Sequence, residues 1–378
     1  MRIKFGDLAI GDIAKDRIKT AMERNWVTEG ANVREFEGKF ARLFAYKHAI
    51  ATSSGTDACI ACVASLYEFG ARRGDEVIVP ATTFVSTANA VLAAGLIPRF
   101  VDIELETLNI NPKMIEEEIT DKTRAIMPVH LMGKPCEMDT ILKVANKHGL
   151  KVIEDACEAH GAQYKGKYVG TIGDMGAFSF YPAHTIVSGE GGMVVTNDDK
   201  IADLVRSIKT HGRPTGSVYF DFQRFGLNLR MNDLTAAIGI EGIEHFNETF
   251  GKRKNNLHKL LHLTEDLSNY CYFIEEEEYV RVSPHAFPLV LKDRKYDRNK
   301  LYGYLESRGI ECKTLFGSLP TQHKAFEFLG HKLGDFPVAE RVGENGLHFG
   351  VYQGMGDDDL VYVSDALKEY FAQFDRNK

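Results

Sequence analysis

Residues 75–103 read DEVIVPATTFVSTANAVLAAGLIPRFVDI, and this stretch decides the fold. It opens with the apolar run DEVIVP, continues through the helical pattern TFVSTANAVLAAG and closes with a second apolar run, IPRFVDI. Short apolar runs on either side of a helical segment are typical of a strand, a crossover helix and a parallel strand. The stretch therefore predicts one unit of a sheet whose strands are joined by helices.

The same alternation extends on both sides of this unit. Further apolar runs lie at residues 48–55, 124–130, 150–157, 177–181 and 191–197, with another helical stretch at 141–149. Together these segments predict an α/β fold, in which a mostly parallel sheet is sandwiched by helices. Such sheets bind their ligands at the carboxyl ends of the strands.

The pattern changes near residue 246. A charged helical stretch at 253–267 is followed by a strand-like run at 285–291 and two more helical stretches, 297–309 and 364–374. This order indicates a smaller α+β domain. We therefore expect a large cofactor-binding domain with an N-terminal arm over residues 1–245 and a small C-terminal domain over residues 246–378.

Composition limits the kinds of partner. The 378 residues are 44% hydrophobic and 26% charged, with a formal net charge of −7. An acidic balance without a Lys/Arg block argues against nucleic acid. No long uncharged apolar run predicts a membrane span, and the charged start is unlike a secretory signal, so a cytoplasmic location is expected by default.

The six cysteines predict no metal site. Only Cys59 and Cys62 are close in sequence, and they lie in TDACIACVASLYEFG, which has the pattern of an amphipathic helix. A zinc site would need a second pair of ligands at similar spacing, and none follows. Buried thiols that pack as small hydrophobic side chains are the better interpretation.

Two motifs at predicted strand ends suggest a bound cofactor. In SSGTDA, Gly55 and Thr56 join a strand to a helix, whose N-terminus favours an anion such as a phosphate. The alternative is a plain helix N-cap. Phe84 follows the strand that ends at Pro80, where its ring could stack on a heterocycle, although a core phenylalanine is the simpler interpretation.

Two more motifs carry ionisable groups. In VIEDACEAHGA, Glu154 and Asp155 close an apolar strand, and a buried carboxylate is costly unless it meets a positive partner such as a protonated pyridine nitrogen. The alternative is an aspartate that caps the next turn. In FSFYPAHTIVSGEGG, residues 178–192, Ser179 could contact a phosphate and His184 precedes a glycine-rich loop. A lone histidine usually only packs against its neighbours. Placed beside a phosphate-binding turn at Gly55 and Thr56, a stacking ring and a buried carboxylate, it is more often catalytic.

Together these motifs resemble the sugar aminotransferase family, which uses pyridoxal 5'-phosphate on the aspartate-aminotransferase-like fold. The resemblance covers most of the chain and implies a PLP-dependent transferase type I fold. Matching stretches occur in order: NWVTEGANVREFEGKFA, SSGTDA, PATTFVSTANAV, VHLMGKP, IEDACEAHGA, FSFYP, GEGGMVVTND and GLNLRMNDLTAAIG.

The resemblance implies specific roles around the cofactor. Thr56 and Ser179 would hold its phosphate, with help from the backbone at Gly55. Phe84 would stack on the pyridine ring. Asp155 would pair with the ring nitrogen and keep it protonated, so that the ring acts as an electron sink.

Two further roles follow from the same resemblance. Glu158 stands where the family usually has Gln beside the ring hydroxyl. Asn228 in GLNLRMND would reach the cofactor phosphate of the neighbouring subunit. The second role implies a homodimer with shared active sites.

The sequence departs from ordinary members of the family at position 184. They carry a lysine that binds the cofactor covalently, whereas this chain has His184. The exchange is similar to that in the 3-dehydratases of nucleotide-linked 4-keto-6-deoxyhexoses. There the cofactor works in its amine form, pyridoxamine 5'-phosphate, the histidine removes a proton from the cofactor's C4′ carbon, and the C3 hydroxyl of the sugar leaves.

Some dehydratases of this kind also carry a [2Fe–2S] cluster, whose cysteines follow the active-site loop. The corresponding stretch here, SIKTHGRPTGSVYFDFQRFG, has no cysteine, and thiolate ligation usually needs four sulfurs. The resemblance therefore favours the cluster-free kind, such as the GDP-4-keto-6-deoxymannose 3-dehydratases, in which glutamate regenerates the amine cofactor.

Two other functions stay open from the sequence. The first is a nucleotide-sugar aminotransferase in which another residue replaces the lysine. The second is a catalytically silent homologue that binds a nucleotide sugar or a partner subunit. Retention of Asp155, Ser179 and the glycine loop argues mildly against silence, because a protein without catalysis has no need of a partner for a protonated ring.

Overall fold

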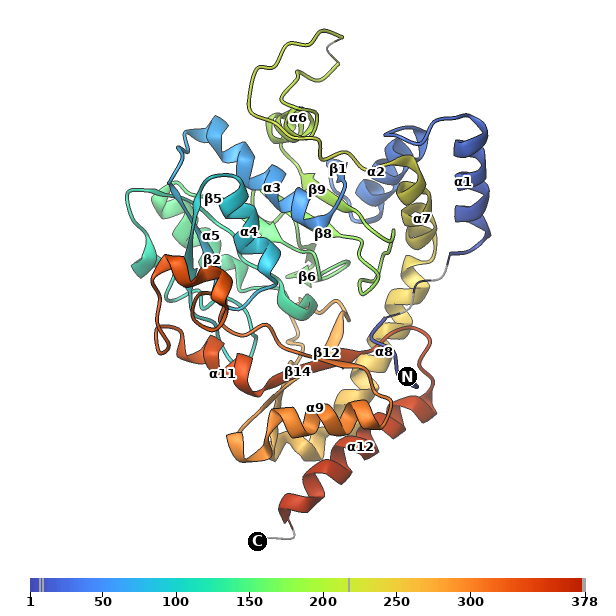
Figure 1. The fold of residues 1–378 in the computed structure, drawn as a ribbon, viewed down its shortest axis with the longest axis vertical. Coiled ribbons are helices and arrows are strands. Elements are labelled where there is room, and N and C mark those ends of the chain that lie inside the picture. The colour runs from blue at the N-terminus through green and yellow to red at the C-terminus, as the bar shows by residue number, and fades with distance from the viewer. Residues whose placement is uncertain (7, 9, 217, 376–378) are drawn as a thin grey trace.

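The large sheet forms the centre of the protein. The computed structural model describes residues 1–6, 8, 10–216 and 218–375 (Figure 1). Seven strands stand in the order β1-β9-β8-β5-β4-β2-β3. Their bounds are β1 His48–Thr52, β2 Glu76–Pro80, β3 Ile97–Val101, β4 Thr123–Ile126, β5 Lys151–Asp155, β8 Met175–Ser179 and β9 Gly192–Thr196. The predicted α/β fold is confirmed.

The sheet is parallel except at β9, which pairs antiparallel with both β1 and β8. The unit predicted from residues 75–103 forms as expected: β2 and β3 pair in parallel, and α4, Val85–Ala93, connects them. β8 and β9 are adjacent, with Ser179 opposite Gly192. The segment that carries His184 is therefore a loop whose two ends meet at neighbouring strand ends.

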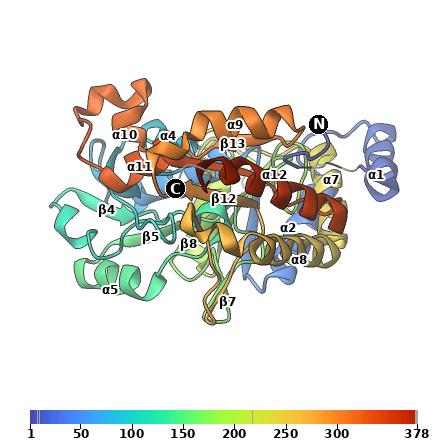
Figure 2. The ribbon, with the colours of Figure 1, turned by 90° about the horizontal axis from the view of Figure 1, so that it is seen from below.

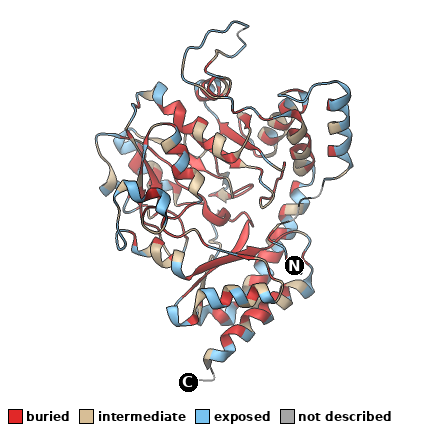
Figure 3. Cartoon of the chain, in the orientation of Figure 1, coloured by how far each residue is buried: buried red, intermediate tan, exposed pale blue. Residues whose placement is uncertain are grey.

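Helices cover the sheet because each buries one apolar face. α3, Gly55–Ser65, packs on β8 and β9, and α5, Met138–His148, packs on β4 and β5. In α5 the buried Met138, Ile141 and Val144 recur at helical spacing, and Gly149 ends the helix in a left-handed conformation. Figure 3 shows the buried strands between helices whose outer faces are exposed.

The C-terminal part is built on a second sheet, which is antiparallel. Its strands stand in the order β10-β12-β14-β13, and α8, α9 and α12 cover it (Figures 1 and 2). A third, small sheet has the order β11-β6-β7. The strand bounds are β6 Gln163–Tyr164, β7 Lys167–Tyr168, β10 Cys271–Phe273, β11 Val280–Arg281, β12 Ala286–Leu291, β13 Cys312–Thr314 and β14 Gly346–Gly350.

Two C-terminal helices begin earlier than the sequence predicts. α8 spans Phe246–Leu263 and α12 spans Asp357–Asp375, whereas α9, Arg298–Ser307, falls within its predicted range. The boundary proposed at residues 245 and 246 falls between α7, Asp233–Glu244, and α8. The start of the N-terminal arm lies against the C-terminal part, since Ile3 forms a parallel bridge with Ile310.

One segment projects from the rest of the molecule. The chain between α6, Asp199–Ile208, and α7 extends beyond the large sheet (Figure 1). It exposes the large apolar side chains Val218, Tyr219, Phe220, Phe222 and Phe225. Within the described residues, no helix combines the length and the apolar character that crossing a membrane requires.

Candidate active site

A cavity of about 320 Å³ lies at the carboxyl ends of β5 and β8 and is closed on its other side by β13 and β14. This is where an open parallel sheet is expected to bind its ligand. The cavity brings together seven of the eight residues singled out from the sequence: Gly55, Thr56, Phe84, Asp155, Glu158, Ser179 and His184.

The start of α3 forms one end of the cavity and has the shape of a phosphate cup. Ser54 caps the helix by accepting a hydrogen bond from the backbone N–H of Asp57 at 3.0 Å, as the N-cap alternative predicted. The same turn also lines the cavity. A side chain at Gly55 would place its Cβ 2.5 Å from the Cβ of Ser179, so only glycine lets α3 approach β8 this closely. The arrangement fits a phosphate at a helix N-terminus.

Asp155 lies on the cavity wall without a cationic partner. Its carboxylate accepts hydrogen bonds from the hydroxyl of Thr87 at 2.7 Å and from the backbone N–H of Cys157 at 3.2 Å. In the part of the chain that the structure describes, no Lys or Arg forms a salt bridge with it. A buried carboxylate with only neutral donors fits a protonated pyridine nitrogen. Phe84, 55% exposed, offers its ring nearby.

Glu154, the other carboxylate of the motif, does not line the cavity. Its two oxygens accept hydrogen bonds from the backbone N–H groups of Gly170 and Gly173, both at 2.7 Å. The oxygen Oε2 also lies 3.0 Å from Nε2 of His130. Successive residues of a strand point to opposite faces of a sheet, so Asp155 faces the cavity and Glu154 faces the core. Glu154 is structural.

His184 lies in the loop between β8 and β9, buried among aromatic rings. Its ring centroid is 5.1 Å from that of His285 and 5.9 Å from that of His160. Its Nδ1 is buried without a hydrogen-bond partner. Burial, together with the charge of Arg253, lowers the pKa of His184 to about 3. The imidazole is therefore neutral in the free cavity.

Glu158 carries the second perturbed group of the cavity. One carboxylate oxygen accepts a hydrogen bond from the backbone N–H of Met132 at 2.6 Å, and the other lies 3.6 Å from Nε2 of His285. Burial is the main cause that raises the pKa of Glu158 to about 7. Unlike the glutamine usual in the family, this side chain can hold or release a proton near neutral pH.

Among the cavity-lining residues that the sequence reasoning missed are His285, Lys313 and Phe316. They come from the C-terminal part, where His285 precedes β12, Lys313 lies in β13 and Phe316 follows it. His285 opens the apolar run HAFPLVL, and a polar residue at the mouth of a buried strand was the available signal.

Asn228 is the one predicted site residue that the cavity of this chain does not include. It is exposed, and its side-chain oxygen accepts a hydrogen bond from Nε of Arg230 at 2.9 Å. Its role toward a neighbouring subunit stays a proposal.

The cavity combines the turn at Gly55 and Thr56, the ring of Phe84, the carboxylate of Asp155 and the imidazole of His184. These groups fit a pyridoxal phosphate-dependent enzyme of the aminotransferase fold. The chain belongs to the DegT/DnrJ/EryC1/StrS aminotransferase family, which residues 9–368 match. The predicted family, fold and pyridoxal phosphate cofactor are confirmed, and the chain is a sugar-modifying enzyme.

Relatives of this chain include GDP-perosamine synthases and a 3-dehydratase. GDP-perosamine synthase of Escherichia coli O157:H7 is 32% identical over 95% of each chain. A dTDP-4-dehydro-2,6-dideoxy-D-glucose 3-dehydratase of Saccharopolyspora spinosa is also 32% identical, over 94% of this chain and 83% of its own. Among solved structures, the GDP-4-keto-6-deoxy-D-mannose-3-dehydratase of E. coli with bound hydrated PLP has a TM-score of 0.88 at 29% identity, covering 97% of this chain and 99% of that one.

Proposed function

We propose that the protein is a 3-dehydratase that removes the C3 hydroxyl of a nucleotide-linked 4-keto-6-deoxyhexose. It would use pyridoxamine 5'-phosphate, which glutamate regenerates from pyridoxal 5'-phosphate. The observation that carries the proposal is His184 on the cavity wall, at the position where the resemblance expects a covalently bound lysine. An imidazole forms no covalent bond with the cofactor but can act as a base.

The side chains of the cavity suit this chemistry. Gly55, Thr56 and Ser179 would hold the cofactor phosphate, and Asp155 would face the ring nitrogen. When bound, the cofactor supplies an electron sink for the carbon that loses its proton. His184 would take that proton. The negative charge of a bound phosphate and substrate would raise its pKa from the value in the free cavity.

Arg253 supports the loop that presents His184. It lies in α8, is 1% exposed and donates a hydrogen bond from Nη1 to the carbonyl of Ala183 at 3.2 Å and another from Nε to Gln353 at 3.0 Å. A buried guanidinium bound to the residue before His184 fixes the position of the imidazole. Its positive charge adds to burial in disfavouring a proton on the imidazole of the free cavity, where the pKa of His184 is lowered.

Product analysis tests the proposal. The protein is incubated with pyridoxal 5'-phosphate, glutamate and nucleotide-linked 4-keto-6-deoxyhexoses, and the products are identified by mass spectrometry and NMR. A 3-deoxy-4-keto sugar is the expected product. A 4-amino sugar would assign the aminotransferase reaction instead, and no turnover of any sugar would support the silent homologue.

One observation favours the aminotransferase as the second candidate. Lys313 lines the same cavity, with its Nζ 4.4 Å from the ring centroid of Phe5. An amine there could replace the missing lysine. Borohydride reduction in the presence of pyridoxal 5'-phosphate separates the two reactions. The dehydratase leaves the chain unlabelled, whereas a reduced pyridoxyl group on Lys313 would establish the aminotransferase arrangement.

A further inference from the structure

Two thiols and one carboxylate converge beneath the cavity. Cys59 comes from α3, Asp155 ends β5, and Cys157 follows it by two residues. One potential ligand atom from each lies within 4.8 Å of the other two. The Sγ of Cys59 is 3.8 Å from Oδ2 of Asp155, to which the thiol donates a hydrogen bond.

We propose that Cys59, Asp155 and Cys157 form a binding site for a soft divalent cation, such as Zn²⁺ or Cd²⁺, in the cofactor-free protein. Tetrahedral zinc with bonds of about 2.3 Å to sulfur separates two thiolates by about 3.8 Å. The present spacing needs a movement of about 1 Å or less to reach that geometry. Thiolates select d¹⁰ cations over Mg²⁺ and Ca²⁺.

The cavity supplies both an entry path and a fourth ligand. Cys157 is only half-buried and lines the cavity, whereas Cys59 is fully buried behind it. A cation can therefore reach the site from the cavity, and a water molecule can complete the coordination. Three protein ligands with one open position are typical of zinc sites that exchange their fourth ligand.

Binding must release protons. A cysteine binds a metal ion only as its thiolate. One cation would displace both thiol protons and leave two metal–sulfur bonds, with no change in oxidation state. The charge of Asp57 in α3 also acts on Cys59, and the charge of Asp155 acts on Cys62, Cys136 and Glu158. Affinity should therefore rise with pH.

The site has a consequence for cofactor loading. Asp155 is the residue proposed to meet the pyridine nitrogen, and one carboxylate cannot serve the nitrogen and a cation in the same place. Cation and cofactor should exclude each other. The cation would bind the protein that lacks the cofactor. The competition therefore does not depend on which reaction the cofactor-bound enzyme performs.

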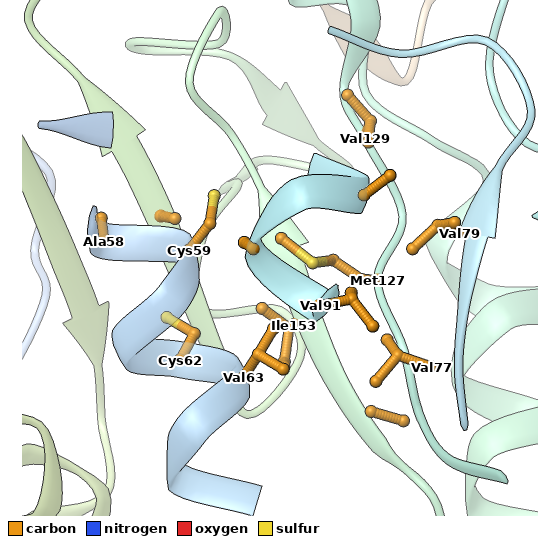
Figure 4. Close-up of a cluster of buried hydrophobic side chains, with 14 of the residues drawn as sticks. Ala58, Cys59, Cys62, Val63, Val77, Val79, Val91, Met127, Val129 and Ile153 are labelled. Atoms are coloured by element: carbon orange, nitrogen blue, oxygen red, sulfur yellow. The ribbon is translucent and has the colours of Figure 1, made fainter. Parts of the chain in front are cut away.

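Titration of the apoprotein with Cd²⁺ tests the inference. Cadmium bound to thiolates absorbs in the ultraviolet, and we expect one ion per chain with this absorption at pH 8. Cys59→Ala and Cys157→Ala should each weaken binding at least tenfold. Cys62→Ala is the matched control, because Cys62 lies one turn further along α3 in the same apolar cluster (Figure 4) and should bind Cd²⁺ like the unaltered protein. Saturation with pyridoxal 5'-phosphate should suppress the absorption.

Several results would overturn the inference. Absence of the thiolate absorption in the apoprotein would do so, as would equal absorption in the Cys59 and Cys157 variants, or binding that pyridoxal 5'-phosphate does not affect. If a variant fails to fold, the unaltered protein decides the question. Cd²⁺ should protect Cys157 from alkylation, measured by peptide mass spectrometry, and unchanged alkylation of Cys157 would refute the site.

Discussion

His184 has a buried ring and a buried nitrogen without a hydrogen-bond partner, a combination that it shares with His160, His285 and His348. An unpaired buried polar atom costs about 1–3 kcal/mol, so a histidine that only packed would be a poor choice at this position. The surrounding His160 and His285 also have lowered pKa values, because burial disfavours their charged forms. The cavity therefore holds its imidazoles neutral, as a base requires.

His184→Asn should separate catalysis from packing. The amide keeps polarity and much of the volume but cannot accept the proton, so turnover should fall by about 10²–10⁴-fold. Binding of cofactor and sugar nucleotide, followed by absorbance and calorimetry, should persist. If His184 only packs the loop, the variant will lose unfolding free energy while turnover per folded molecule stays unchanged. Both quantities must be measured on the same preparation.

Glu158→Gln should change how stability depends on pH. The folded protein raises the pKa of Glu158 from an ordinary 4.5 to about 7, so between these values it holds a proton that the unfolded chain has released. This contribution to the unfolding free energy is lost as pH rises through the window. Glutamine does not titrate, so the variant should gain stability relative to the unaltered protein from pH 4.5 to 8 in urea denaturation.

The buried histidines serve as an internal reference for that experiment. Their lowered pKa values give the opposite slope, because the unfolded chain binds protons that the folded protein does not. His184 is present in both proteins and cancels in the difference, whereas His285 lies 3.6 Å from Glu158 and is affected by the substitution. Parallel stability curves for the two proteins would contradict the raised pKa of Glu158.

At the scale of elements, the sequence predicted the parallel sheet well and the edges of the C-terminal helices poorly. Strands such as β2 and β5 are short apolar runs bounded by helical segments, which is the strongest local signal. The first turns of α8 were missed because Asn247 and Gly251 weaken the helical pattern there. Phe246 and Phe250 are buried against the aromatic core, and this tertiary packing stabilises the first turns of the helix.

Site residues that belong to one short sequence motif could be predicted, whereas those brought to the cavity by the packing of distant segments could not. The phosphate cup and Asp155 belong to single strand-to-helix or strand-to-loop motifs. His285 reaches the cavity because the antiparallel sheet folds against the large one, and the local pattern in residues 280–291 marks it only as a polar residue before an apolar strand. A role for Asn228 in another subunit is likewise beyond any pattern within one chain.

Gly55→Ala tests the contact between α3 and β8. The added methyl group would lie 2.5 Å from the Cβ of Ser179, so the helix must move away from the strand. We expect a loss of about 1–3 kcal/mol in unfolding free energy and at least tenfold weaker cofactor binding by fluorescence titration. Gly251→Ala is the control, since a methyl group there meets nothing within 4 Å and alanine favours the helix. Unchanged cofactor binding in Gly55→Ala would argue against the phosphate cup.

For the whole molecule, the projecting segment between α6 and α7 is the feature that exposes the most apolar surface. Its apolar side chains, among them Phe220 at 83% exposed and Phe225 at 68%, form an unusual surface for a protein that stays monomeric. Exposed Asn228 lies at the base of the same segment. Both observations support the proposed homodimer, in which each subunit would complete the other's site.

Mixing two inactive variants tests shared sites. His184→Asn removes the base of a subunit's own site, and Asn228→Ala removes the contact proposed for its partner. A mixed dimer would then contain one intact site, so refolding the variants together at equal amounts should recover up to about a quarter of the unaltered turnover. Each variant refolded alone gives the baseline. No recovery, with dimers verified by sedimentation, would place Asn228 outside the partner's site.

The pairing of Ser179 with Gly192 has an evolutionary consequence. Because the ladder of β8 and β9 closes the loop at its base, residue 184 can be exchanged without altering the register of any strand. Under the proposed function, the scaffold would permit a change of reaction by substitution at this position. Codons for histidine and lysine differ at both the first and the third base, so a stepwise route passes through asparagine or glutamine. Neither amide can act as the base or bind the cofactor covalently, and a lineage crossing between the two reactions would have to survive an inactive ancestor or keep a second copy of the gene.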